Sequence, residues 1–322
     1  CPICHKPNLR RANFCQHCGQ DIVLNNGGPS YYITRIIKEG GQGAVYETVG
    51  DDGKVYAVKE MLDRFTDPKE RAEALERFDE EAQLLKRLSH PRIPRIYASF
   101  KDEERQYLAM DFVRGKDMED IIRERGALPE AEVLTWADQL CDVLNYLHNH
   151  RPEPIIFRDM KPSNCFVTGD GKAIVGDYGL SISQTNNPAD GGQLTRSGMI
   201  MGTPAFSPPE QLRGLTLDQR ADIYSTAGTL YYLLTGRAPV ERHSSVETVA
   251  AVLEGAIPDV RTLREDVPDN LAAVVARSLS ANPAKRPATY AELRMELLPF
   301  SSVAKEPAPL GLRVIAHLLD SL

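Results

Sequence analysis

One stretch of the chain decides its fold: residues 155–164, with the sequence IIFRDMKPSN. An apolar, strand-like run ends here in a loop in which Asp159 is followed two positions later by Lys161 and five positions later by Asn164. A carboxylate can accept a hydroxyl proton, an ammonium group can steady a moving phosphoryl group, and a carboxamide oxygen can hold a metal ion. The stretch therefore predicts a loop built for phosphoryl transfer.

A second polar loop follows at residues 175–179, with the sequence VGDYG. Its Asp177 is the predicted main ligand of Mg²⁺, with Asn164 as the other protein ligand, because hard cations prefer oxygen donors. The alternative is two unrelated polar loops. The order and spacing of the two motifs argue against it.

A lysine and a glutamate nearer the N-terminus form a predicted ion pair. Lys59 ends the apolar segment at residues 56–59 (YAVK), where a buried charge without a partner would be costly. Glu81 lies in a helix predicted to begin at Pro68, after the N-cap Asp67. The alternative is a solvated lysine on the edge of a strand.

Glycines at 40, 41 and 43 lie between two predicted strands, in GGQGAV at residues 40–45. This context excludes a dinucleotide-binding turn, which leads into a helix, and favours a flap whose N–H groups close over phosphates. We therefore predict that Gly40, Gly41 and Gly43 cover a nucleotide. A plain hairpin turn is the alternative.

The pattern of residues 31–300 predicts a strand-rich first third followed by helices. Strands are expected at residues 31–38, 44–49, 54–61, 96–100 and 106–112. Helices are expected at residues 117–124, 130–148, 218–235, 246–254, 269–279 and 289–297.

These motifs, in this order over about 270 residues, resemble the protein kinase family, and their order is similar to that of bacterial serine/threonine kinases. Residues 202–210 (GTPAFSPPE) resemble the end of the family's activation segment, and Arg286 matches the arginine that pairs with Glu210. The resemblance implies an α+β fold with a β-rich small lobe (31–110), a hinge (111–115) and a helical large lobe (116–300).

The resemblance also implies a role for each matching residue. Lys59, oriented by Glu81, would hold the α- and β-phosphates of ATP, and Asp159 would be the catalytic base, with Lys161 beside it. Asn164 and Asp177 would bind Mg²⁺ or Mn²⁺. The adenosine part of ATP would be contacted by Val45, Ala57, Met110, Asp111, Val113, Asp117 and Phe166.

The implied activity is transfer of the γ-phosphoryl group of ATP to serine or threonine hydroxyls of proteins. The chain departs from the family pattern at Lys38, where a glycine is usual, at Phe157, where histidine is usual, and at Tyr178 and Pro208. None of these changes removes a group that touches phosphate, metal or the transferred proton. They keep open the alternative of a pseudokinase scaffold.

Regulation is predicted from Arg158, which stands next to the catalytic base and can pair with a phosphate. Thr195 and Ser197, in the loop at residues 180–201, are the predicted sites of autophosphorylation, by similarity to bacterial relatives. The alternative is that these hydroxyls only keep the loop soluble.

The first 24 residues predict a zinc ribbon. Cys1, Cys4, Cys15 and Cys18 form two Cys-x-x-Cys pairs, and four thiolates make the tetrahedral site that Zn²⁺ favours. Disulfide pairing or redox chemistry is the alternative. Residues 14–19 resemble the second knuckle of small bacterial zinc ribbons. Four cysteine ligands leave no open coordination position, so a structural metal is expected, and a docking or positioning role is the leading hypothesis for the module. Residues 25–30 read as a linker.

Composition and charge limit which partners and which compartment are expected for the chain. The net charge of −7 argues against nucleic acid as the main partner, and no run of eighteen apolar residues is present. Four of the six cysteines are clustered as expected of metal ligands, and Cys141 and Cys165 lie inside apolar runs. This usage predicts a reducing compartment such as the cytoplasm. The tail at residues 301–322 predicts an amphipathic helix.

Overall fold

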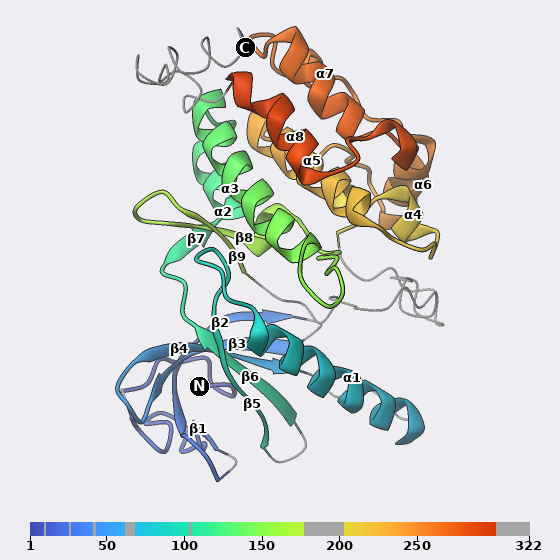
Figure 1. The fold of residues 1–322 in the computed structure, drawn as a ribbon. Coiled ribbons are helices and arrows are strands. Elements are labelled where there is room, and N and C mark those ends of the chain that lie inside the picture. The colour runs from blue at the N-terminus through green and yellow to red at the C-terminus, as the bar shows by residue number, and fades with distance from the viewer. Residues whose placement is uncertain are drawn as a thin grey trace, which may run out of the picture. The chain divides into compact units, whose positions relative to one another are not determined.

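The computed structural model describes residues 1–9, 11–25, 27–40, 43–61, 68–102, 105–176 and 203–300. The chain divides into two compact units, Cys1–Gly115 and Lys116–Leu322. Figure 1 shows that strands dominate the first unit and helices the second.

The first unit is built on a six-stranded antiparallel sheet with the strand order β1-β2-β3-β4-β6-β5. Its strands are β1 (Val23–Leu24), β2 (Tyr31–Gly40), β3 (Gly43–Gly50), β4 (Val55–Met61), β5 (Ile96–Asp102) and β6 (Arg105–Asp111). One helix, α1 (Pro68–Arg87), packs against β5 (Figure 1). The turn between β3 and β4 forms because Gly53 adopts a left-handed conformation and Asp52 accepts a hydrogen bond from the backbone of Lys54.

The register of the sheet sorts its side chains onto two faces. Tyr46, Val58 and Ala109 lie directly opposite one another across β3, β4 and β6, and therefore share one face. The next row, which contains Lys59, lies on the opposite face because side chains alternate along a strand.

The cysteine-rich segment packs on the face that carries Tyr46, Val58 and Ala109. Strand β1 pairs with the start of β2, so this segment is hydrogen-bonded into the sheet. A single buried cluster spans the segment and the sheet: Cys1, Cys15, Ile22, Leu24, Tyr31, Ile33, Ala44, Tyr46, Tyr56, Val58, Tyr107 and Ala109.

The second unit is mainly helical. Its helices are α2 (Met118–Arg125), α3 (Glu130–His148), α4 (Pro209–Leu212), α5 (Gln219–Thr235), α6 (Ser245–Glu254), α7 (Asp269–Ser278) and α8 (Tyr290–Leu297). Short 3₁₀ helices are η1 (Pro162–Asn164), η3 (Pro204–Phe206), η4 (Val260–Thr262), η5 (Pro283–Lys285) and η6 (Leu298–Phe300). A small sheet has the strand order β7-β8-β9, formed by β7 (Gly115–Asp117), β8 (Cys165–Thr168) and β9 (Ala173–Val175).

Helix α5 is the centre of this unit. It is buried on all sides from Ala221 to Tyr231, as expected of a helix that is not amphipathic, and it packs against α3, α7 and α8. Asp218 caps its N-terminus by accepting a hydrogen bond from the backbone of Arg220, and Gly236 ends it in a left-handed conformation. Its position decides where the neighbouring loops can be anchored.

The predicted helices of the second unit are confirmed to within one residue at each end. The five predicted strands of the first unit are also present, with ends that differ by at most two residues. Strands β1, β7, β8 and β9 and the four-residue helix α4 were not predicted from the sequence, since each is too short to show a period. Asp67 and the tail at 301–322 lie outside the described residues.

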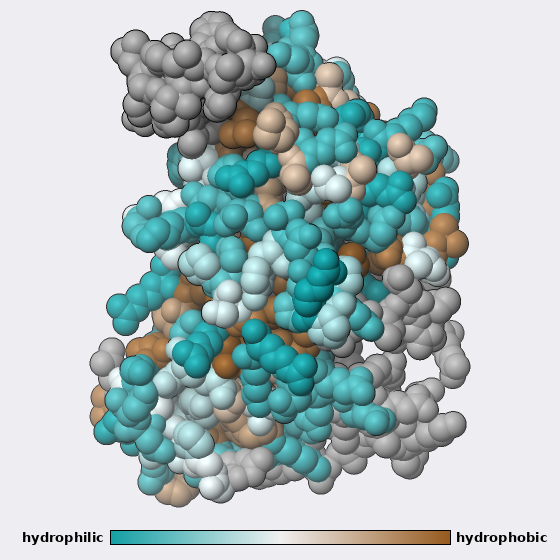
Figure 2. All heavy atoms as spheres, in the orientation of Figure 1, coloured by the Kyte–Doolittle hydropathy of each residue, from teal (hydrophilic) through white to brown (hydrophobic). Residues whose placement is uncertain are grey.

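Hydrophilic residues cover most of the face shown in Figure 2, in keeping with a chain in which 26% of residues are charged. Within the described ranges, no helix is both long and apolar enough to cross a membrane.

Candidate active site

The loop after residue 157 brings Asp159, Lys161 and Asn164 together. The ammonium group of Lys161 lies 3.0 and 2.9 Å from the two carboxylate oxygens of Asp159. The side-chain amide of Asn164 donates to the Asp159 carboxylate at 2.7 Å and to its backbone carbonyl at 2.9 Å. Two donors therefore fix the orientation of the carboxylate, which is still 21% exposed and so accessible to a substrate hydroxyl.

A buried aspartate in α5 holds the backbone of this loop. Asp222 is fully buried and accepts hydrogen bonds from the backbone N–H groups of Phe157 and Arg158, both at 2.7 Å. Its carboxylate also lies 3.1 Å from Nε2 of His148, at the end of α3. Charge-assisted hydrogen bonds of this kind are about twice as strong as neutral ones.

This anchor accounts for an unusual backbone conformation. Arg158 has a φ of 65°, in the left-handed region that non-glycine residues rarely adopt. Its N–H is held by Asp222, and its carbonyl accepts a hydrogen bond from Gln211 at 3.1 Å. The conformation persists because α4 and α5 hold both sides of the residue, and it turns the next residue, Asp159, out of the core.

The side chain of Asn164 could hold a metal ion. It is fully buried, and its carboxamide oxygen has no hydrogen-bond partner among the described residues. A buried acceptor left unpaired is costly, and a bound cation would satisfy it. The backbone of Asn164 also accepts a hydrogen bond from Gly176, the residue before Asp177. Asp177 itself lies outside the described residues.

In the first unit, Lys59 and Glu81 are both buried, with exposed fractions of 6% and 8%. Lys59 lies opposite Val45 and Leu108 in the sheet, and the next row on the same face contains Ala57 and Met110. The predicted nucleotide contacts Val45, Ala57, Lys59 and Met110 therefore share one face, which is the face away from the cysteine-rich segment.

The glycine-rich turn joins β2 to β3, and Gly40 pairs with Gly43. Gly43 must be glycine, since it has a φ of 137° and a Cβ there would lie 2.0 Å from the carbonyl oxygen of Glu60. Gly41 lies outside the described residues. The requirement for glycine at position 43 therefore comes from its close packing against β4.

The remaining predicted nucleotide contacts occupy loops and a short strand. Asp111 accepts hydrogen bonds from Tyr97 at 2.8 Å and from the backbone of Arg95 at 2.9 Å, which fixes the start of the predicted hinge. Asp117 caps α2 through the backbone of Asp120, so a structural role alone could explain this residue. Val113 is partly exposed, as is Phe166 in β8.

The predicted pair of Glu210 and Arg286 is confirmed. The two guanidinium nitrogens of Arg286 lie 2.6 and 2.9 Å from the two carboxylate oxygens of Glu210, and the side chain of Arg286 is fully buried. This bidentate pair ties α4 to the segment that follows α7.

Of the three residues in the regulatory prediction, the structure describes only Arg158. Arg158 is 8% exposed, so its side chain is buried within the described part of the chain. Thr195 and Ser197 lie outside the described residues.

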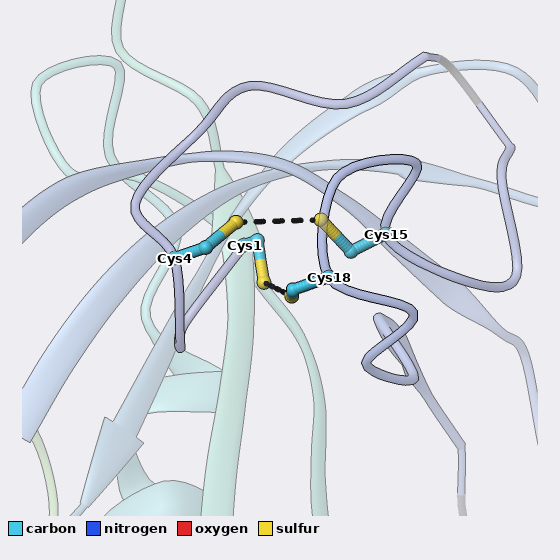
Figure 3. A group of neighbouring side chains, drawn as sticks. All are labelled: Cys1, Cys4, Cys15 and Cys18. Atoms are coloured by element: carbon cyan, nitrogen blue, oxygen red, sulfur yellow. Dashed lines mark hydrogen bonds between the residues drawn. The ribbon is translucent and has the colours of Figure 1, made fainter.

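The four N-terminal cysteines converge on one point (Figure 3). All four sulfurs lie within 4.8 Å of one another, and the Cys1–Cys18 and Cys4–Cys15 sulfurs are 3.5 Å apart. No disulfide links them. Four sulfurs bound at ~2.3 Å to one tetrahedral ion would be about 3.8 Å apart, so the cluster fits a metal.

Hydrogen bonds favour the thiolate that such a metal needs. Burial raises the pKa of the Cys15 thiol, but the backbone N–H groups of His17 and Cys18 and the thiols of Cys4 and Cys18 together lower it to about 6. The chemistry of the donor set, four sulfurs with no oxygen or imidazole in the cluster, favours a soft or borderline cation.

The structure also reveals residues that the sequence analysis missed. The sequence analysis placed Asp222 only within the helix predicted at residues 218–235, and it assigned no role to His148 or Gln211. A carboxylate near the start of a helix that shows no polar face was the available signal for Asp222. The other two gave no local signal, because their partners lie 74 and 53 residues away.

The second unit has a cavity of about 580 Å³ lined by residues of α5, α6 and α7, among them Tyr231, and by residues of the segments that follow α6 and α7, among them Asp259 and Lys285. None of the predicted catalytic or nucleotide-binding residues lines it, so it is separate from the catalytic loop.

Comparison with known proteins places the chain in a family. Residues 31–298 match the protein kinase domain. The chain is 30% identical over 283 residues to the "Probable serine/threonine-protein kinase CPE1738" of Clostridium perfringens, covering 87% of this chain and 39% of the relative. It is 29% identical over 277 residues to the "Tyrosine-protein kinase MasK" of Myxococcus xanthus, covering 82% and 42%. The chain thus spans about two fifths of the length of these relatives.

A solved structure supports the fold. The crystal structure of Rad53 1-466 in complex with AMP-PNP superposes with a TM-score of 0.68 at 23% identity, covering 84% of this chain and 65% of that one. The chain belongs to the protein kinase domain family, with its β-rich and helical units. This family membership implies ATP, a divalent metal ion and protein substrates.

Proposed function

We propose that the chain is an ATP-dependent serine/threonine protein kinase. The observation that carries the proposal is the catalytic loop, where Lys161 and Asn164 orient the carboxylate of Asp159 and leave it accessible. In this reaction the acceptor oxygen forms a bond to the γ-phosphorus, the bond to the bridging oxygen of ADP breaks, and the hydroxyl proton passes to Asp159.

The other residues act by position and charge. Lys161, at hydrogen-bond distance from Asp159, would steady the phosphoryl group as it moves. Lys59 is buried on the face of the sheet away from the cysteine-rich segment. It would hold the α- and β-phosphates, with Glu81 as its partner. Val45, Ala57, Met110, Asp111, Val113 and Phe166 would contact adenine, Asp117 ribose, and Gly40, Gly41 and Gly43 the phosphates.

We propose Mg²⁺ as the divalent ion, with Asn164 and Asp177 as its ligands. The buried, unpaired oxygen of Asn164 supports the first of these. When bound, the ion would offset negative charge on the phosphate oxygens. We propose Zn²⁺ for the four-cysteine cluster, where Cys1, Cys4, Cys15 and Cys18 leave no open coordination position and the metal is structural.

The domain boundaries are proposed as a metal module (1–24), a linker (25–30), a kinase domain (31–300) and a tail (301–322). We propose that Arg158 pairs with phosphate that the enzyme itself places on Thr195 or Ser197. Four free thiols in one cluster support a reducing, cytoplasmic setting.

A protein acceptor rather than a small molecule is expected from the family. Serine or threonine is proposed over tyrosine because Lys161 lies two residues after the base, as in the family's serine/threonine members, and because CPE1738 bears that name. Because the relative MasK is named a tyrosine-protein kinase, the type of residue that this chain phosphorylates should be tested directly.

The test is an assay with radiolabelled ATP, Mg²⁺ and a generic basic protein substrate, followed by phosphoamino-acid analysis. Wild type should yield phosphoserine or phosphothreonine, and Asp159→Asn should be slower by about 10²–10⁴-fold. Mass spectrometry of the same sample should find phosphate at position 195 or 197. Equal incorporation by both proteins would instead support a pseudokinase scaffold with a contaminating activity.

We also propose a docking role for the metal module. Three of its apolar side chains, Ile3, Leu9 and Phe14, are 60–64% exposed, which supports a contact with a protein partner. Replacing all three by serine should leave zinc content unchanged and weaken phosphorylation of the cognate substrate but not of a short peptide.

A further inference from the structure

We infer that the zinc ion of the four-cysteine cluster is a structural part of the nucleotide-binding sheet, so that zinc occupancy controls how tightly the chain binds nucleotide. The inference rests on the zinc site and the nucleotide-binding face proposed above. It concerns the first unit alone, where the cysteines, the covered face of the sheet and Lys59 all lie.

The metal ligands belong to the hydrophobic core of the sheet. Cys1 is fully buried and Cys15 is 3% exposed. Both lie in the same buried cluster as Tyr31 and Ile33 of β2 and Tyr46 of β3. A change at the metal therefore reaches the core directly, because two of its four ligands are core side chains.

Hydrogen bonds attach the module to the sheet at separate points. The backbone of Ile33 donates to Ile22 at 2.9 Å, and the backbone of Asn8 donates to the carbonyl of Thr34 at 2.8 Å. The guanidinium group of Arg11 donates to the carbonyl of Asp51, in the β3–β4 turn, at 2.6 Å. Together with the β1–β2 pairing, these contacts seat the module as a cover over one face of the sheet.

The covered face and the nucleotide-binding face share the same strands. Val58 points toward the module, and its neighbour Lys59 points the opposite way. The same one-residue step separates Tyr46 from Val45 in β3 and Ala109 from Met110 in β6. Because a packed interior transmits strain, strands that lose packing on one face should hold the side chains on the other face less firmly.

The module has little to hold it together without the metal. Among the described residues 1–24, only Cys1, Cys15, Ile22 and Leu24 are buried apolar side chains, and two of these are ligands. A segment this short does not bury enough surface to fold alone, so metal binding supplies its stability. Losing zinc should therefore uncover the module-facing side of β2, β3 and β4.

The decisive experiment removes zinc from the whole 322-residue chain with a zinc-selective chelator and follows hydrogen exchange by mass spectrometry. We expect amides of residues 31–61 to exchange at least about tenfold faster, while α3 and α5 keep their protection. The dissociation constant of a fluorescent ATP analogue, measured with excess Mg²⁺, should rise by about tenfold or more. Added Zn²⁺ should restore both values, and further Mg²⁺ should not.

Two variants provide a matched pair. Cys15→Ser should lose zinc and reproduce the effects of chelation, whereas Gln16→Ala, an exposed neighbour that supplies no sulfur, should keep zinc and behave as wild type. If Cys15→Ser fails to fold, the chelation experiment on wild type still decides the question.

The outcomes separate this inference from the proposals beneath it. Zinc that leaves while exchange in residues 31–61 and nucleotide affinity stay unchanged would overturn it, as would a purified chain that binds no zinc at all. A chain that transfers no phosphate but shows zinc-dependent protection of β2–β4 and zinc-dependent nucleotide affinity would refute the catalytic proposal and support the inference.

Discussion

The two units hold their chemical groups in place by different means. In the second unit, the loop with Asp159 is anchored from inside, by hydrogen bonds to Asp222 in a helix that is buried on all sides. In the first unit, the sheet with Lys59 is covered from outside, by a short segment whose core includes Cys1 and Cys15 of the four-cysteine cluster. The comparison teaches that one unit can fix its chemical groups through a fully buried helix, while the other relies on a short covering segment, whose stability we propose comes from a bound ion.

The different sizes of the two units explain why they hold their chemical groups in different ways. The second unit has enough helices to bury α5 completely, so a charged side chain there can be paired and shielded from water. Among its described residues, the first unit has a single sheet and one helix, and the segment before β2 covers part of the remaining face. A sheet that would otherwise be solvated on this side gains a second packed layer.

The largest expected effect is on the buried ion pair of the second unit. Arg286→Gln should lower the free energy of unfolding by about 3–5 kcal/mol, because Glu210 is left buried without its partner. Chemical denaturation followed by circular dichroism measures this. Arg294→Gln breaks the exposed pair with Asp138 and should cost no more than about 1 kcal/mol. Equal losses in the two variants would contradict the assignment of α4 and its pair to the core.

A smaller loss is expected at the junction of the metal module and the sheet. Ile22→Ala removes a side chain that is 1% exposed and should destabilise the first unit by about 2–5 kcal/mol. Zinc content should be unchanged, since no ligand is altered. Thermal unfolding with metal analysis tests both statements, with Ile3→Ala, 64% exposed in the same module, as the control. A normal melting temperature for Ile22→Ala would mean that the module does not support the sheet.

The anchoring of the catalytic loop can be tested without removing a catalytic group. Asp222→Asn keeps the shape of the side chain but replaces one acceptor of a backbone N–H by an amide group, so Asp159 should shift. We expect kcat to fall by about 10²-fold with little change in the dissociation constant for ATP. Asp218→Asn, at the exposed cap of the same helix, should change neither value. Weaker ATP binding without a loss in kcat would show that Asp222 does not act through the loop.

The smallest expected effect is a difference in thiol reactivity between the cysteines of the two units. Burial raises the pKa of the Cys141 thiol to about 12 and raises that of Cys165 as well, so at pH 8 almost no thiolate is present at either position. After removal of zinc, the metal module should lose its fold and expose its cysteines, so iodoacetamide should label positions 1, 4, 15 and 18 and leave 141 and 165 unmodified. Peptide mass spectrometry reads this directly, and denatured protein should label at all six positions. Labelling of Cys141 in native protein would show that α3 opens.

Much of this architecture was predictable because it is local. The helices from 117 to 297 follow from apolar periodicity and capping residues, and their ends agree with the structure to within one residue. The grouping of Asp159, Lys161 and Asn164 was predictable because five residues of chain cannot separate them far. Roles for Asp177, Thr195 and Ser197 stay predictions, since these residues lie outside the described part of the chain.

The sequence by itself determined the kinase family, the order of the elements and the grouping of the four N-terminal cysteines, because motifs and short spacings carry that information. Only the tertiary structure decided that Asp222 and His148 support the catalytic loop and that residues 25–30 lead from a two-residue strand straight back into the sheet. These features depend on contacts between residues far apart in the chain, and on a strand too short to have a period. Packing of distant side chains selects such contacts, and no local pattern reports them.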